Sequence, residues 1–190
     1  GFAESTFRQG KYSDVMLIYL CKYFNGPTKQ MAELWKAAGE FQIDTFDLEE
    51  RILTQMLYTT DYTPHMEEIY ESYCAGGGRD LVCMAYLSYF ANMYLTEDAV
   101  VPEHVFRQIR KRYLTGGDLN RVCRIALLKY LSENHLSERD RKIADELLDT
   151  CIRHNLYFAF FRKFDEKLLR KYQLTDKFFL EYHTAPGQQI

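Results

Sequence analysis

Acidic residues in the first half of the chain are its best candidates for catalysis. Asp44, Asp47 and Glu50 lie within one short stretch. Glycoside hydrolases hold two carboxyl groups about 5 to 10 Å apart in a cleft, and the aromatic residues, 15% of the chain, could line such a cleft. A carbohydrate-active hydrolase that uses paired carboxylates is therefore one hypothesis. It requires the fold to bring the acids together rather than leave them scattered and exposed.

Other chemical signatures are missing from the sequence. It contains no H-E-x-x-H, G-x-S-x-G, Walker or G-x-G-x-x-G motif. No histidine lies three or four residues from another, the spacing that would place two metal ligands on one helix face, although His65 and Glu68 form an i, i+3 pair. We therefore predict no catalytic residues, no metal and no cofactor.

The cysteines indicate buried thiols rather than disulfides. Their number is odd, no C-x-x-C pair occurs, and each lies in an apolar helical stretch. The five are Cys21, Cys74, Cys83, Cys123 and Cys151. We expect them to be reduced residues of the core.

Charge is unevenly distributed along the chain. Residues 1–100 contain 7 basic and 15 acidic residues, whereas residues 101–190 contain 17 basic and 12 acidic ones. Such polarity suits docking to an oppositely charged partner. The candidate basic face consists of Arg107, Arg110, Lys111, Arg112, Arg121 and Arg124. Nucleic-acid binding by this face is a weaker alternative, because the whole chain has a net charge of −3.

A repeat of about forty residues indicates the architecture. The segment Tyr73–Gly77 recurs as Tyr113–Gly117, and Val82-Cys83 recurs as Val122-Cys123. A period of this length with helical patterning between the echoes is typical of stacked helix hairpins. The sequence predicts an all-α array of the HEAT or tetratricopeptide kind, an α-solenoid, in which the glycines end helices rather than hold phosphate.

Apolar periodicity predicts about four antiparallel hairpins, because short loops make consecutive helices neighbours. Thr28 is expected to cap the second helix, Asp44 or Thr45 the third, and Ser137 the last. Gly26 is expected to be left-handed, and Pro64 to occupy a first helical position. The paired helices are predicted near 13–24 and 28–38, 45–57 and 64–75, 79–94 and 101–114, and 118–134 and 137–154.

The end of the chain has a different pattern. Five aromatic residues within 157–164 predict a short capping helix. Alternation over 178–183 predicts a strand. We therefore divide the chain into a helical-repeat domain, residues 1–174, and an extended tail, residues 175–190, which is expected to be the first strand of a following β domain.

Membrane insertion is not expected, because the apolar runs are far shorter than the ~18 residues that suggest a membrane span. No signal peptide is visible, and with reduced cysteines this favours a cytoplasmic protein. The first residue is Gly1 rather than methionine. We expect the natural N-terminus to lie further upstream.

Several phrases resemble an uncharacterised family of large multi-domain proteins of Gram-positive gut-type bacteria. They are LCKYFNGPT at 20–28, LWKAA at 34–38, LEERILTQML at 48–57, FAFF at 158–161 and EY at 181–182. The resemblance implies a helical segment of a longer protein, with β-rich sequence to follow. It implies no activity, cofactor or catalytic residue.

The interpretation that the sequence favours is a non-enzymatic helical-repeat scaffold, or protein-interaction module, within a larger protein. Stacked hairpins bury one face and leave another free for partners. The expected partner is another protein or another domain of the same chain, and the oligomeric state is left open. The hydrolase and the nucleic-acid binder are the alternatives.

Overall fold

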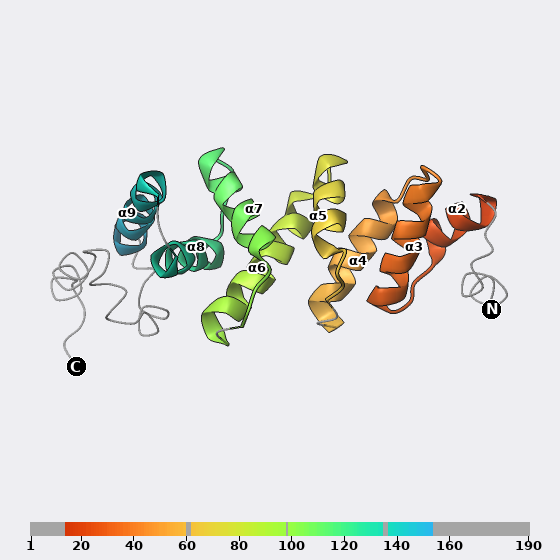
Figure 1. The fold of residues 1–190 in the computed structure, drawn as a ribbon, viewed down its shortest axis with the longest axis horizontal. Helices are drawn as coiled ribbons and strands as arrows, with labels where there is room; N and C mark the ends of the chain where they lie inside the picture. The colour runs from red at the N-terminus through yellow and green to blue at the C-terminus, as the bar shows by residue number, and fades with distance from the viewer. Residues whose placement is uncertain (1–13, 60–61, 98, 135–136, 154–190) are drawn as a thin grey trace. The chain divides into compact units, whose positions relative to one another are not determined.

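The computed structural model describes residues 14–59, 62–97, 99–134 and 137–153. Across these ranges the chain forms eight α-helices and no strand, which confirms the all-α prediction. In chain order they are α2 (Asp14–Tyr23), α3 (Thr28–Glu40), α4 (Phe46–Thr59), α5 (Met66–Ala75), α6 (Asp80–Thr96), α7 (Glu103–Leu114), α8 (Arg121–Glu133) and α9 (Glu138–Arg153) (Figure 1).

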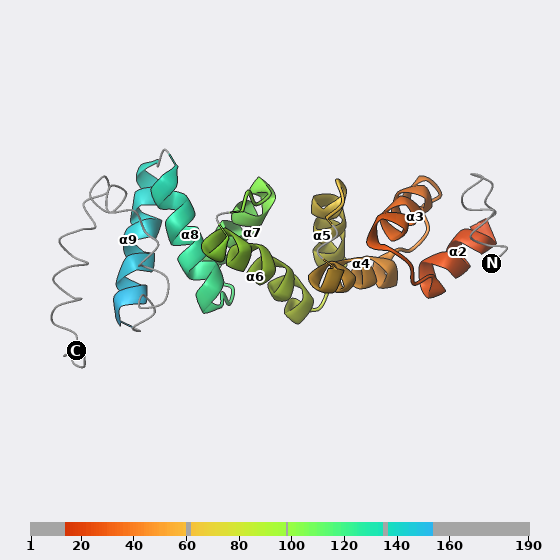
Figure 2. The ribbon, with the colours of Figure 1, turned by 90° about the horizontal axis from the view of Figure 1, so that it is seen from below.

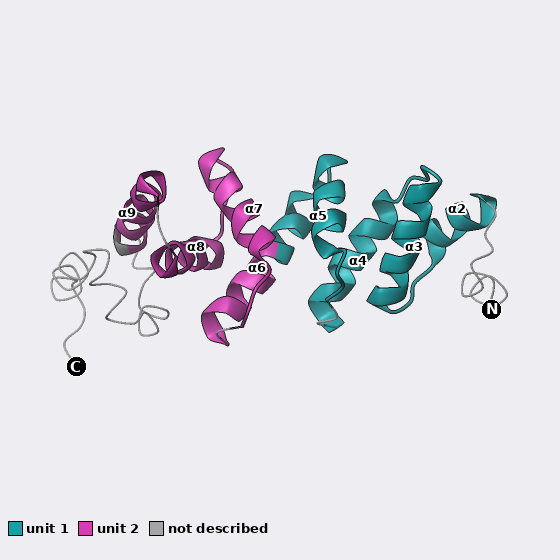
Figure 3. Cartoon of the chain, in the orientation of Figure 1, with its two compact units in different colours: residues 1–86 teal, residues 87–190 magenta. Residues whose placement is uncertain are grey.

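The chain divides into two compact units, residues 1–86 and residues 87–190, with the boundary inside α6 (Figure 3). In the first unit α2 packs on α3 and α4, and α4 contacts both α3 and α5. In the second unit α8 contacts both α7 and α9, and the last two helices lie side by side in both views (Figures 1 and 2). Helices thus pack mainly on their neighbours in sequence, as predicted for a helical array.

Glycines end α5 in a Schellman motif. Gly77 has a φ of +85°, in the left-handed region where an L side chain is strained. Its N–H donates to the Cys74 carbonyl at 3.3 Å, and the Gly78 N–H donates to the Tyr73 carbonyl at 2.9 Å. The two bonds use carbonyls that the helix end leaves without partners. The predicted role of this triple glycine as a helix stop is confirmed.

The end of α7 repeats this pattern with a small change of register. Gly116 has a φ of +70°, and Gly117 donates its N–H to the Arg112 carbonyl at 3.0 Å. The left-handed glycines, Gly77 and Gly116, are therefore 39 positions apart, whereas the following helices begin 41 positions apart, at Asp80 and Arg121. The spacing of about forty residues lies between these two values, because the loop from α7 to α8 is two residues longer than the loop from α5 to α6.

Two predicted N-caps are confirmed. The Ser137 hydroxyl accepts the Asp140 N–H at 3.2 Å and donates to its carboxylate at 2.7 Å. The Ser137 hydroxyl is therefore the N-cap of α9, and the Asp140 carboxylate bonds this hydroxyl rather than the backbone N–H that a capping box would use. At α4, the Asp44 carboxylate accepts the Phe46 N–H at 3.0 Å.

Other predicted helix ends are wrong. Thr28 does not cap α3; the cap position is Pro27, and Thr28 is buried with its hydroxyl 3.5 Å from that of Thr59. Pro64 lies in a turn before α5, which begins at Met66. Gly26 is not left-handed. A Cβ there would lie 2.4 Å from Cζ of Phe24, so a side chain at this position would require the Phe24 ring to move.

Apolar stripes form the core of the first unit. The apolar side chains that recur every three or four residues along α3, α4 and α5 are largely buried, and Met31, Ile52 and Tyr73 are 0% exposed. Each such side chain contributes about 1.5–3 kcal/mol relative to an exposed one. On α2 the buried side chains are Leu17 and Leu20, whereas Ile18 and Tyr19 are more than half exposed.

Some expectations concern residues outside the described ranges. These are the aromatic capping helix at 157–164, the strand at 178–183, and the domain boundary at 174/175. Within the described residues, no helix combines the length and the apolar character that crossing a bilayer requires.

Candidate functional site

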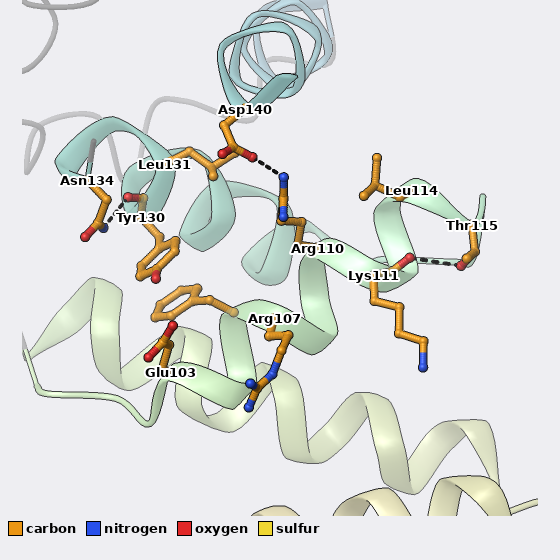
Figure 4. Close-up of a pocket in the computed structure, with 11 residues that line it drawn as sticks. Glu103, Arg107, Arg110, Lys111, Leu114, Thr115, Tyr130, Leu131, Asn134 and Asp140 are labelled. Carbon is orange, nitrogen blue, oxygen red and sulfur yellow. Dashed lines mark hydrogen bonds and ion pairs between the residues drawn. The ribbon is translucent and has the colours of Figure 1, made fainter. Parts of the chain in front are cut away.

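A pocket of about 570 Å³ opens on the second unit. Its walls come from α7, the second half of α8 and the first turn of α9 (Figure 4). Short connections bring these three helices together, and Asp140 on the α9 wall is held by its two hydrogen bonds with Ser137. The size lies within the range of ligand pockets, about 300–1,000 Å³.

The pocket has an apolar floor made of stacked rings. Phe106 on α7 is 3% exposed and stacks on Tyr130 of α8, with centroids 4.1 Å apart and planes 8° apart. The Tyr94 ring of α6 meets Phe106 edge-on at 4.8 Å. Leu131 is buried beside them, and Leu114 is exposed at the pocket's edge. The floor can therefore accept an apolar side chain.

Basic side chains of α7 line the rim. Arg107 and Lys111 are four residues apart, so they lie on the same face of the helix, and both are exposed. Arg110 pairs with Asp140 of α9 at 2.5 Å. That ion pair joins α7 to the start of α9, so Arg110 has a structural role at the rim. Arg107 and Lys111 are more exposed than Arg110.

Acidic groups also face the pocket and act on Tyr130. Burial is the main cause of the raised pKa of the Tyr130 phenol; the Glu103 and Asp140 carboxylates raise that pKa further, and Arg110 opposes them. The phenol is therefore protonated at neutral pH and can donate a hydrogen bond. The rim is mixed in charge, with three basic and two acidic side chains.

The structure separates the six residues of the predicted basic face. Arg107, Arg110 and Lys111 line the pocket, whereas Arg112, Arg121 and Arg124 do not. Burial raises the pKa values of Cys123 and Cys151 to about 11. Arg112 partly offsets this at Cys123, and Arg124 and Arg121 do so at Cys151. The second group of arginines therefore lies near buried thiols of α8 and α9, away from the pocket.

The three carboxylates of the hydrolase hypothesis differ in exposure and in hydrogen-bond partners. Asp44 and Asp47 are exposed, the first as a cap and the second in the first turn of α4. Glu50 accepts the Tyr73 hydroxyl at 2.5 Å and the Arg79 Nε–H at 3.2 Å. The Tyr73 hydrogen bond is the main cause of a lowered Glu50 pKa. Such a carboxylate stays ionised at neutral pH, which suits an ion pair better than a general acid.

Glu49 is a buried acidic residue that was not among the predicted site residues. It lies in the first turn of α4 and is 2% exposed. Its Oε1 accepts hydrogen bonds from Trp35 Nε1 at 2.8 Å, Thr45 Oγ1 at 2.8 Å and Ser72 Oγ at 2.7 Å. The signal was its position, three and four residues before Ile52 and Leu53, on the apolar stripe.

The next groups to consider are possible metal ligands and the five cysteines. Among the residues that the structure describes, no group of three or more His, Cys, Asp or Glu side chains could hold a metal ion. The His65 Nδ1 lies 2.9 Å from the Glu68 carboxylate, as a local pair. None of the five cysteines forms a disulfide, and four of them are buried, but Cys74 is exposed, so its assignment to the core is wrong.

The comparisons with known proteins identify a family without assigning an activity. The family model described as "Family of unknown function (DUF5717) C-terminal" matches residues 1–190, and the chain belongs to this family. No curated protein and no solved structure matches the chain. The predicted resemblance to an uncharacterised family is confirmed at this level.

Proposed function

We propose that this member of the DUF5717 C-terminal family is a non-enzymatic protein-interaction module, and that it binds a segment of another protein in the pocket between α7, α8 and α9. The observation that carries the proposal is the combination of the Phe106–Tyr130 floor with the exposed Arg107 and Lys111 on the rim. Interface cores are rich in aromatic residues and arginine, and their rims are polar.

The chemistry of the pocket selects the kind of segment. An apolar side chain can fill the space over the stacked rings, because removing both surfaces from water is favourable. Carboxylates of the segment can approach Arg107 and Lys111, and the Tyr130 phenol can donate to a backbone carbonyl. The proposed occupant is therefore a peptide segment in which an apolar residue is flanked by aspartate or glutamate.

The wider setting is part of the same proposal. We take the chain to work inside a longer bacterial multi-domain protein in the cytoplasm, where its partner is another protein or another domain of that chain. The word C-terminal in the family description supports the longer protein, and cysteines that form no disulfide suit a reducing compartment.

The test is selection of a displayed library of random peptides on the whole 190-residue chain. We expect enriched peptides to combine an aromatic or aliphatic residue with acidic neighbours. The double variant Arg107→Glu, Lys111→Glu should bind them at least about tenfold more weakly, since reversed rim charges repel the segment. The matched control is Lys29→Glu, Lys36→Glu, which reverses two exposed lysines on α3 of the other unit.

Three results would contradict the proposal. One is enrichment of peptides with no shared apolar or acidic feature. Another is equal binding by the rim variant and its control. The third is tight binding of single- or double-stranded nucleic acid with a steep dependence on salt, which would favour the nucleic-acid alternative instead.

A further inference from the structure

We propose that Cys74 and Cys83 form a thiol–disulfide exchange site at the junction of α5 and α6. Their Sγ atoms lie 2.8 Å apart. Cys74 is the penultimate residue of α5, and Cys83 lies in the first turn of α6. A disulfide has a sulfur–sulfur distance of about 2.05 Å, so the two thiols already face each other across a gap that a small side-chain movement closes.

The backbone between the two cysteines holds them in place. The Gly77 N–H donates to the carbonyl of Cys74 itself, and the Cys83 N–H donates to the Arg79 carbonyl at 3.2 Å. The Arg79 N–H in turn donates to the Tyr73 hydroxyl at 3.0 Å. Both sulfurs therefore project from a turn whose ends are fixed by hydrogen bonds, which keeps their effective concentration high.

Exposure assigns different roles to the two thiols. Cys74 is exposed, so a small-molecule disulfide can reach it, whereas Cys83 is 3% exposed and has its Sγ against that of Cys74. The other three thiols are poor competitors. Burial raises the pKa values of Cys21, Cys123 and Cys151 to about 11, which leaves little thiolate at neutral pH.

The exchange takes place in two steps, with a small-molecule disulfide such as oxidised glutathione as the oxidant. The Cys74 thiolate attacks one sulfur of that disulfide, forms a mixed disulfide and releases one small thiolate. The Cys83 thiolate then attacks the Cys74 sulfur and releases the second small thiolate. The protein loses two protons and two electrons, and the small disulfide is reduced to two thiols.

The product covalently joins the end of α5 to the first turn of α6 across the glycine turn. Closing this short loop restricts the unfolded chain, so the oxidised protein should melt at a higher temperature than the reduced one. The change is reversible by reduced glutathione. Redox conditions would thus set the stability of this junction in the first unit.

The experiment incubates the whole chain in glutathione buffers of increasing oxidised-to-reduced ratio, then quenches with acid, alkylates and digests with trypsin. Arg79 lies between the two cysteines, so cleavage there leaves two peptides, 52–79 and 80–107, joined only by the disulfide. We expect this linked pair to appear as the ratio rises, and the number of alkylated thiols to fall from five to three.

Variants and a denatured sample make the result specific. Cys74→Ser and Cys83→Ser should each abolish the linked pair, whereas Cys151→Ser, which removes a buried thiol of α9, should leave it unchanged. In urea the Cys74–Cys83 disulfide should form more slowly than in the folded chain, because only the short loop and no longer the fold brings the two thiols together. The proposal is overturned if glutathione remains on Cys74 without transfer to Cys83, or if the pair forms no faster in the folded chain than in urea.

Discussion

Glu49 is a buried carboxylate of the first unit that accepts three side-chain hydrogen bonds. Three neutral donors, from α3, from the residue before α4 and from α5, converge on one carboxylate oxygen. None of these three donors carries a positive charge, so their hydrogen bonds must compensate for the burial of the carboxylate. The residue therefore joins three successive segments of the array at one buried point.

Replacing Glu49 tests this role. Glu49→Ala leaves three donors without their acceptor and should destabilise the chain by about 3 kcal/mol, whereas Glu49→Gln keeps one oxygen and should cost about 1 kcal/mol. Urea unfolding followed by circular dichroism measures both. Glu33→Ala, on the exposed face of α3, is the control and should change stability by less than about 0.5 kcal/mol. Equal losses for the two Glu49 variants would contradict the account.

The lowered pKa of Glu50 predicts that the stability of the fold depends on pH. The Tyr73 hydrogen bond, with a smaller contribution from Arg79, holds the pKa of Glu50 below its ordinary value. A carboxyl with a depressed folded-state pKa stabilises the fold above its unfolded pKa, and this stabilisation is lost as the pH falls through the folded pKa. The stability gap between wild type and Tyr73→Phe should therefore be widest above about pH 5 and should narrow below it.

Unfolding in urea at a series of pH values measures that gap. In a Glu50→Gln background the difference between Tyr73 and phenylalanine should no longer vary with pH, because the titrating group is absent. A wild-type gap that stays constant down to the acid transition would show that the Tyr73–Glu50 bond does not influence the titration.

At the scale of elements, the helix stops explain why the sequence repeats. Gly77 and Gly116 occupy the same place in two Schellman motifs, and both have open space where a Cβ would lie. The requirement for glycine at these positions is therefore set by the left-handed φ and not by crowding. Gly39 also has open space, but it lies inside α3 without a positive φ.

This difference predicts opposite effects of one substitution. Gly77→Ala and Gly116→Ala should each destabilise the chain by about 1 kcal/mol, because alanine is strained at a positive φ. Gly39→Ala should stabilise it by about 0.5–1 kcal/mol, because alanine is the better helix former. Thermal unfolding of the three variants measures this. A loss of stability for Gly39→Ala, or no loss for the other two, would contradict the assignment of these helix ends.

Sequence patterns predicted the positions of the helices better than the buried face of α2 or the pocket. Apolar stripes and glycine stops are local signals, so the positions of the helices and the faces of α3 to α5 could be predicted. The outward face of α2 could not, because its apolar residues surround the helix and only packing on α3 and α4 selects Leu17 over Ile18. The pocket also depends on packing, since Phe106 and Tyr130 come from different helices.

At the scale of the whole molecule, each of the two units carries a polar feature of its own. The first holds the buried carboxylate and the two facing thiols, and the second holds the pocket with its basic rim. The uneven charge along the sequence pointed to the second half, but only half of the predicted basic face lines the pocket. Opposite charge on a partner segment remains the central expectation.

A charge-swap binding measurement tests that expectation most directly. A peptide selected on the wild-type chain is labelled with a fluorophore, and its affinity is measured by anisotropy for the wild type and for Arg107→Glu, Lys111→Glu. The same is done for a peptide in which the acidic residues are replaced by lysine. We predict that the original peptide prefers the wild type and the lysine peptide prefers the variant, each by about tenfold. If both peptides bind both proteins equally, the α7 rim does not recognise a charged segment and the proposed function is wrong.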